Sequence, residues 1–242
     1  MEQNKTGKYL KYAIGEILLV MIGILLALQV NNWNEERKDR KVELKILQEL
    51  YSVLNGGVIQ GDLSFQKEQI KQNKKSKASG NLIIKYFNDN LPYHDSLKSH
   101  FAYAHKRSIA PIKIHAYQNA KEYGLNFITN DSLKEQLSWA YETNTIWLNE
   151  LNTRNNLYEN STVLPIITEL FDNIDIGEYD VVGLERRSMI PNDYESLKTN
   201  KTYINLLKTT IHKREEYLLF QERRYERMLK LASYLNDEIE QN

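Results

Sequence analysis

The feature that most constrains this chain is an apolar run of nineteen residues near its N-terminus, YAIGEILLVMIGILLALQV, from Tyr12 to Val30. An α-helix rises about 1.5 Å per residue, so this run would reach about 28 Å, close to the hydrocarbon thickness of a bilayer. Asn31, Asn32 and a dense run of charged residues follow it. We therefore expect a transmembrane helix over residues 12–32, preceded by a short basic tail, residues 1–11.

Two other interpretations compete with a membrane-spanning helix. A buried core helix rarely lies this close to an N-terminus, behind only a short basic tail. A cleaved signal peptide would also begin with basic residues, here Lys5, Lys8 and Lys11. However, the apolar run is longer than a signal core, and no small residues mark a cleavage site after Ala27. The sequence favours an uncleaved signal anchor.

The orientation of this anchor is left open by its flanking charges. A larger basic group follows the apolar run, namely Arg37, Lys38, Arg40, Lys41 and Lys45. The positive-inside rule taken alone therefore favours a cytoplasmic C-terminal part. The short basic leader of a signal anchor favours the opposite. We expect a single-pass protein of the bacterial inner membrane, with the large domain in the periplasm.

Glu16 is a carboxylate inside the apolar run, where an ionised group costs about 2.5–3.5 kcal/mol at the bilayer centre. One explanation is that it lies one turn into the helix and reaches headgroup water, favoured by the helix dipole. The other is that it faces protein, on one helical stripe with Leu19 and Gly23. Gly23 and Ala27 form a small-xxx-small pair that allows close helix approach. The sequence thus predicts a packing face of Glu16, Leu19, Gly23 and Ala27, with Trp33 in the interfacial aromatic belt.

The composition favours long helices and excludes several kinds of site. The 32 Lys and Arg residues balance 32 Asp and Glu residues, so net charge does not indicate a nucleic-acid partner. There are no cysteines, which excludes disulfides and thiolate chemistry, and only 10 glycines and 4 prolines. We expect an all-α protein: the transmembrane helix continues as a juxtamembrane helix over residues 33–56, and an antiparallel helical bundle domain follows over residues 57–242.

Helical periodicity and turn residues divide the bundle domain. A capping box at Ser132 and Glu135 predicts the start of one helix. Arg214 and Gln221 interrupt the heptad seam of the last helix, which is about forty residues long. Residues 172–192 look like a long connection. The helices expected before this connection cover about 62–87, 96–106, 114–123, 132–163 and 165–171.

The sequence shows no recognised catalytic, cofactor or metal motif, and we predict that the protein is not an enzyme. The one cluster of metal-ligand types is His94, Asp95, His100 and His105, whose spacing does not place the histidines on one helical face. Surface histidines are the favoured interpretation. No cofactor, metal ligand or catalytic residue is predicted.

The anchor sequence KYAIGEILLVMIGILLALQVNNWNEERK resembles the N-terminal signature of an uncharacterised family of single-span membrane proteins of Bacteroidetes-type bacteria. The stretch from Ala116 to Leu133, a helix, a Gly turn and an Asn/Asp-capped helix, is similar to a second landmark of that family. Tyr123 before Gly124 departs from the small residue expected there. The resemblance implies an all-helical domain on a membrane anchor and implies no activity.

Two functions from different classes remain. The leading hypothesis is a noncatalytic, membrane-anchored helical interaction or scaffold protein that self-associates or joins a membrane complex. Its partners would be the lipid bilayer and a second copy or another membrane protein, and not nucleic acid. The alternative is a membrane-anchored sensor or ligand-binding helical domain with a pocket between helices near Trp139 and Trp147. Enzymatic chemistry has no support in the sequence.

Overall fold

The computed structural model describes residues 5–56, 61–106, 114–180 and 183–241. The fold is all-α, as predicted, with one small two-stranded sheet. Its elements, in chain order, are α1 (Lys5–Asn55), α2 (Asp62–Asn88), α3 (Leu97–Ala104), α4 (His115–Tyr123), the 3-10 helix η1 (Leu125–Phe127), α5 (Asp131–Ser138), the π-helical turn η2 (Trp139–Thr143), α6 (Asn144–Tyr158), the π-helical turn η3 (Glu159–Val163), α7 (Leu164–Leu170), the strands β1 (Phe171–Asp180) and β2 (Gly183–Pro191), α8 (Tyr194–Thr199) and α9 (Lys201–Glu240).

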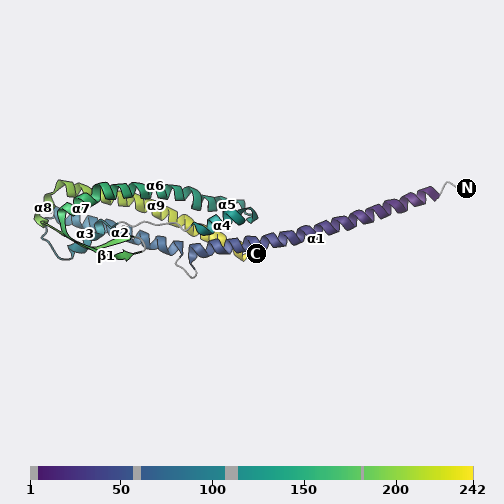
Figure 1. The fold of residues 1–242 in the computed structure, drawn as a ribbon, viewed down its shortest axis with the longest axis horizontal. Coiled ribbons are helices and arrows are strands. Elements are labelled where there is room, and N and C mark those ends of the chain that lie inside the picture. Colours follow the sequence, from purple (N-terminus) through teal and green to yellow (C-terminus); the bar gives the residue numbers. More distant parts are fainter. Residues whose placement is uncertain (1–4, 57–60, 107–113, 181–182, 242) are drawn as a thin grey trace.

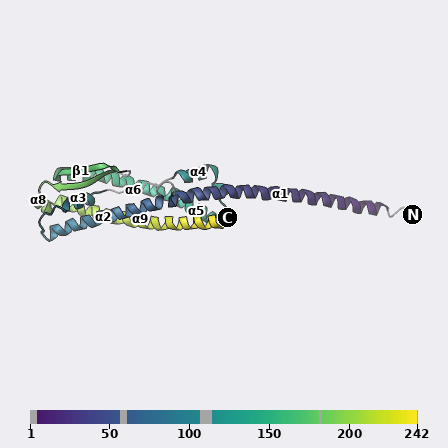
Figure 2. The same ribbon diagram turned by 90° about the horizontal axis from the view of Figure 1, so that it is seen from below.

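The first helix is one continuous element of 51 residues, and its N-terminal half projects far beyond the rest of the molecule (Figures 1 and 2). Every residue from 12 to 39 is exposed. The apolar side chains from Tyr12 to Val30 therefore pack against nothing else in the described parts of the chain. This helix is long and apolar enough to cross a membrane.

The C-terminal half of α1 belongs to the bundle. Leu47, Leu50 and Leu54 are fully buried, at the three- and four-residue spacing of one helix face. The segment expected at residues 33–56 therefore divides: residues 33–39 are an exposed stalk, and the residues from Arg40 onwards lie in the body of the molecule.

The bundle is antiparallel, as predicted. The packed half of α1, α2, and the nearly continuous rod from α5 to α7 run in one direction, and α9 returns in the other (Figure 1). Two contacts fix the register of α9: Arg40 pairs with Glu238 at 3.3 Å, and Lys77 pairs with Glu215 at 2.6 Å. The C-terminus consequently lies where α1 leaves the bundle (Figures 1 and 2).

The apolar core is divided into two clusters at opposite ends of the bundle. Near the exit of α1, the buried residues of α1, α4, α5 and η2 meet Met228, Leu231 and Leu235 of α9. At the far end, the buried residues of α2, α3, α7, the hairpin and α8 surround Tyr203 and Leu207 of α9. The stretch of α9 between Leu207 and Met228 instead buries several polar side chains. This polar layer separates the two apolar clusters.

The prediction of a long connection at residues 172–192 is wrong, because this segment forms an antiparallel hairpin of β1 and β2. Its pairing is interrupted by shifts in register, for example between Asp175 and Ile176. Phe171 and Met189 are buried in the far apolar cluster, and β2 lies against α3. The hairpin depends on this tertiary contact, since an isolated two-stranded hairpin is marginally stable at best.

The start of α5 also differs from the prediction. The N-cap is Asn130, whose side chain accepts a hydrogen bond of 3.1 Å from the Leu133 amide. Ser132 therefore lies inside the first turn and does not cap the helix. Further along, the rod does not stop before Pro165: the π-helical turn η3 precedes it, and Pro165 lies in the first turn of α7. A wider turn accommodates the amide hydrogen bond that proline cannot make.

Candidate functional site

The predicted packing face of the anchor lies on the exposed, projecting part of α1. Glu16, Leu19, Gly23 and Ala27 are all exposed, and a Cβ atom built at Gly23 would meet nothing within 4 Å. Trp33 is also exposed and follows the end of the apolar run. The described part of the chain brings no other element to these residues.

The bundle contains a different candidate site in its polar layer. Asp62, Gln66, Gln69 and Asn73 of α2 are all buried, at a spacing of four, three and four residues. This spacing places them on one helix face, which the 3.6-residue period would normally fill with apolar side chains. The face is directed at α9, where Gln221 and Arg224 are also buried.

Part of this polar layer is satisfied within the bundle. The Asn73 amide nitrogen donates to Gln221 Oε1 at 2.8 Å, and Arg214 Nη1 donates to Asn73 Oδ1 at 2.8 Å. Arg214 Nη2 also donates to the Lys106 carbonyl oxygen at 2.8 Å. The two residues that interrupt the heptad seam of α9 therefore find their partners on α2 and just after α3.

Another part of the layer has no hydrogen-bond partner among the described residues. It comprises Nε and Nη2 of Arg224, Nδ2 of Asn144, Nε2 of Gln221, the hydroxyl of Tyr141, and both amide atoms of Gln66. An unsatisfied buried donor or acceptor costs about 1–3 kcal/mol. Such groups are rare in native cores, so their concentration in one layer marks this layer as a candidate binding region.

Arg224 is the central charge of the layer. It is only 3 % exposed, and burial lowers the pKa of its guanidinium to about 10, against the opposing attraction of Asp62 and then of Tyr217 and Tyr141. The lowered pKa means that the protein interior disfavours the charged form of Arg224, although the guanidinium stays protonated at neutral pH. A negative charge placed beside it would relieve this penalty.

A groove of about 680 Å³ runs beside this buried arginine, between α9 and the start of the α5–α7 rod. Arg224 and Asn144 form part of its wall, and Trp139, Trp147 and Phe220 supply aromatic surface. Its other charged lining residues are Arg223, Arg227, Lys230 and Glu226. The groove is thus strongly cationic, with aromatic side chains on both helices.

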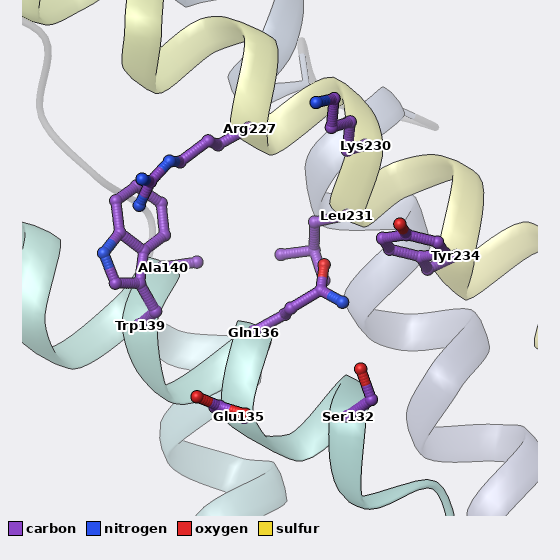
Figure 3. Close-up of a pocket in the computed structure, with 9 residues that line it drawn as sticks. All are labelled: Ser132, Glu135, Gln136, Trp139, Ala140, Arg227, Lys230, Leu231 and Tyr234. Carbon is purple, nitrogen blue, oxygen red and sulfur yellow. The ribbon is translucent and has the colours of Figure 1, made fainter.

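A second hollow of about 450 Å³ continues the groove toward the exit of α1 and shares Trp139, Arg227 and Lys230 with it (Figure 3). In Figure 3, Gln136 extends from α5 and Leu231 from α9 into the space between the two helices. The Arg227 guanidinium lies over the Trp139 ring, 4.3 Å from its centre. This cation–π contact divides the two hollows.

The π-helical turn η2 positions Trp139 at the junction of the hollows. π-helical turns insert one extra residue and occur frequently at functional sites. A cluster around Glu142 holds the turn: Lys121 donates to it at 2.7 Å and Ser138 at 3.0 Å. Hydrogen bonds from Lys121, Ser138 and Tyr117 lower the pKa of Glu142, so this carboxylate keeps its charge and its partners at neutral pH.

The histidine cluster is dispersed in the structure. His94 is exposed beside Ser96, His100 bonds to Ser79 at 3.1 Å, and His105 is buried, with Nε2 at 3.1 Å from the Tyr203 hydroxyl. The expectation of a surface histidine is therefore wrong for His105, which the far apolar cluster covers. No group of three metal-ligand side chains occurs within the described ranges.

Sequence reasoning located one wall of the groove and missed the other. Trp139 and Trp147, which suggested an interhelical pocket, both line the groove. Arg224 and Asn144 gave no such signal, because a single buried arginine cannot be recognised before its helix is packed. A usable hint was the four basic residues of α9 within eight positions, Arg223, Arg224, Arg227 and Lys230, which begin two residues after Gln221 on the seam.

Comparison with known proteins adds one match. No curated protein and no solved structure matches the chain. Residues 16–105 match the model described as "Family of unknown function (DUF6090)". The match covers most of α1, all of α2 and α3, and ends at His105, before the helices that form the groove. This part of the chain, from the anchor to α3, is therefore similar to an uncharacterised domain family.

Proposed function

We propose that the protein is a noncatalytic, membrane-anchored helical module that associates with itself through its transmembrane segment. The observation that carries the proposal is the exposure of every residue from 12 to 39 in a helix whose first nineteen of these residues form the apolar run. Elsewhere in the described residues most large apolar side chains are buried, and the exposed ones, such as Ile146, Leu157 and Leu219, do not form a run of this length. Leaving such a helix in water would be unfavourable, and a bilayer supplies the missing apolar environment.

The self-association half of the proposal rests on the face formed by Glu16, Leu19, Gly23 and Ala27. Small residues four positions apart let two helix backbones approach closely, and a polar side chain on that face gains a partner from the second helix. Leu25 lies on the opposite side of the same helix. A symmetric pair of helices would bury the first face and leave Leu25 against lipid.

Oxidative cross-linking in native membranes tests this geometry, because the chain has no cysteines of its own. We expect Gly23→Cys to form disulfide-linked dimers efficiently and the matched control Leu25→Cys to form few. Gly23→Ile and Glu16→Ala should each lower the native mass of the gently extracted protein. Equal cross-linking at both positions, or a monomer for the unaltered chain, would contradict self-association.

The orientation is tested with two further single-cysteine variants, Asn4→Cys in the N-terminal tail and Ser233→Cys on the exposed surface of α9. We propose that the bundle lies in the periplasm of a bacterial cell. A membrane-impermeant maleimide added to intact spheroplasts should then label Ser233→Cys and not Asn4→Cys. The reverse pattern would place the bundle in the cytoplasm.

The groove beside Arg224 favours a second candidate function, a membrane-anchored ligand-binding domain. The specific observation is that Arg224 and Asn144 line a cationic, aromatic groove and carry buried donors that have no hydrogen-bond partner among the described residues. The two candidates are compatible, since one concerns the span and the other the bundle.

A further inference from the structure

We propose that the groove between α9 and the α5–α7 rod binds a soluble organic anion, with its oxyanion group at Arg224 and Asn144 and its apolar body between Trp139 and Trp147. This inference rests on the second candidate function and gives that site its ligand class. It does not depend on self-association of the span.

Two residues of the groove wall carry buried donor atoms that have no acceptor among the described residues. Nε and Nη2 of Arg224 and Nδ2 of Asn144 are buried, and none has a hydrogen-bond partner within the described residues. Both residues line the groove and are at most 3 % exposed. Guanidinium and amide nitrogens can only donate, so the complementary group must accept hydrogen bonds from more than one direction. Carboxylate, phosphate and sulfonate groups have this property.

Charge favours the same class of ligand. Arg223, Arg227 and Lys230 join Arg224 along the groove, and Glu226 is the one carboxylate among its described lining residues. Asp62 attracts Arg224 from the α2 side, away from these residues, and offsets part of its charge. A buried arginine with two nitrogens that lack hydrogen bonds within the described residues is costly, and a bound oxyanion would supply the missing hydrogen bonds.

The aromatic side chains indicate that the ligand also has an apolar, flat part. Trp147 is 61 % exposed, although tryptophan is usually well covered in folded proteins. Trp139 already uses one face for Arg227. An inorganic ion would leave Trp147 and Phe220 uncovered, whereas an aromatic or apolar body beside the oxyanion would bury them.

With the span embedded as proposed above and Trp33 at the membrane interface, distance along the helices separates the groove from the lipid headgroups. Arg40 lies seven residues after Trp33, and it pairs with Glu238, which lies fourteen residues after Arg224. At 1.5 Å per residue these steps add to about 30 Å from the interfacial tryptophan to Arg224. The headgroup region is only about 5–8 Å thick on each side of the hydrocarbon. A soluble anion therefore suits the groove better than a headgroup of that bilayer.

Isothermal titration calorimetry on the full chain in detergent micelles tests the proposal, with 1-naphthyl phosphate as the probe. We expect saturable binding of 1-naphthyl phosphate, and binding at least tenfold weaker for inorganic phosphate and for neutral 1-naphthol. Arg224→Gln should weaken binding about 10- to 100-fold, the range expected for hydrogen bonds to a charged group. Arg227→Ala, at an exposed position, should weaken it several-fold. Lys208→Ala, an exposed change elsewhere on α9, is the matched control.

Circular dichroism shows whether each variant is folded. If Arg224→Gln does not fold, Arg227→Ala still tests the proposal. No saturation by 1-naphthyl phosphate up to about 1 mM would overturn the proposal, as would unchanged affinity in both variants. Binding of 1-naphthyl phosphate is also measured after reconstitution in phosphatidylcholine with and without phosphatidylglycerol, which shows whether the site takes a soluble anion or a lipid headgroup. Equal affinity supports a soluble ligand, and competition by the anionic lipid would overturn it. The cross-linking experiment reports on the span alone, so either proposal can fail without the other.

Discussion

Glu43 determines where α1 joins the bundle. Its side chain is 1 % exposed, pairs with Arg40, and accepts hydrogen bonds from the amide and hydroxyl of Thr129 at 2.7 and 3.2 Å. We predict that Glu43→Ala lowers the free energy of unfolding by about 2–4 kcal/mol, because it removes charge-assisted hydrogen bonds and leaves their donors unpaired. Urea unfolding followed by circular dichroism measures this change.

The control for Glu43 is Glu36→Ala, one of the exposed charges of the stalk, which should change stability by no more than about 0.5 kcal/mol. Equal effects of the two substitutions would show that the Glu43 contacts do not hold α1 to the loop before α5.

Tyr117 gives a prediction about alkaline pH. Burial, together with Glu142, raises the pKa of its hydroxyl from 10.0 to about 12. The unfolded chain therefore releases this proton at lower pH than the folded chain does. The contribution of Tyr117 to the free energy of unfolding should be fully present and independent of pH below pH 10. It should be lost as the pH rises from 10 toward 12. Thermal melts across this range should show a smaller decline for Tyr117→Phe, and an identical decline would contradict the assignment.

At the scale of elements, Gly80 permits the close contact of α2 with α9. A Cβ atom at this position would lie 2.8 Å from Cγ1 and 3.1 Å from Cδ1 of Ile211. We predict that Gly80→Leu destabilises the protein by about 1–3 kcal/mol through overpacking, despite the better helix propensity of leucine. The matched control is Ala78→Leu at an exposed position of α2, which should be nearly neutral in the same urea titration. A neutral Gly80→Leu would mean that the two helices can separate at no cost.

Sequence periodicity predicted where the helices are, but it did not predict which side chains of other helices they contact. It predicted α9 and its interruptions at Arg214 and Gln221, but a heptad position does not say which side chain it will meet. Both residues contact Asn73, which lies more than 140 residues away in the chain. The β1–β2 hairpin was missed for a related reason: its largely polar strands become stable only when Phe171 and Met189 are covered by the bundle.

At the scale of the whole molecule, the proposed membrane anchoring places the three tryptophans at different distances from the bilayer. Trp33 follows the apolar run at the start of the stalk, and Trp139 and Trp147 lie in the groove, about 30 Å beyond Trp33 at the level of Arg224. We predict that brominated lipids quench the fluorescence of Trp33 and leave that of the other two unchanged. Trp33→Phe should therefore abolish most of the quenching in reconstituted vesicles, and residual quenching would place the bundle against the membrane.

The sequence by itself determined the helical class, the long apolar helix near the N-terminus and most helix bounds, because these follow from local periodicity, capping and turn residues. Only the tertiary structure decided that α1 is half exposed and half packed, that polar side chains of α2 and α9 form a layer between two apolar cores, and that Arg224 faces a groove. These features depend on which helix faces meet. That choice is made by burial and hydrogen bonding between residues far apart in the chain, which no local pattern encodes.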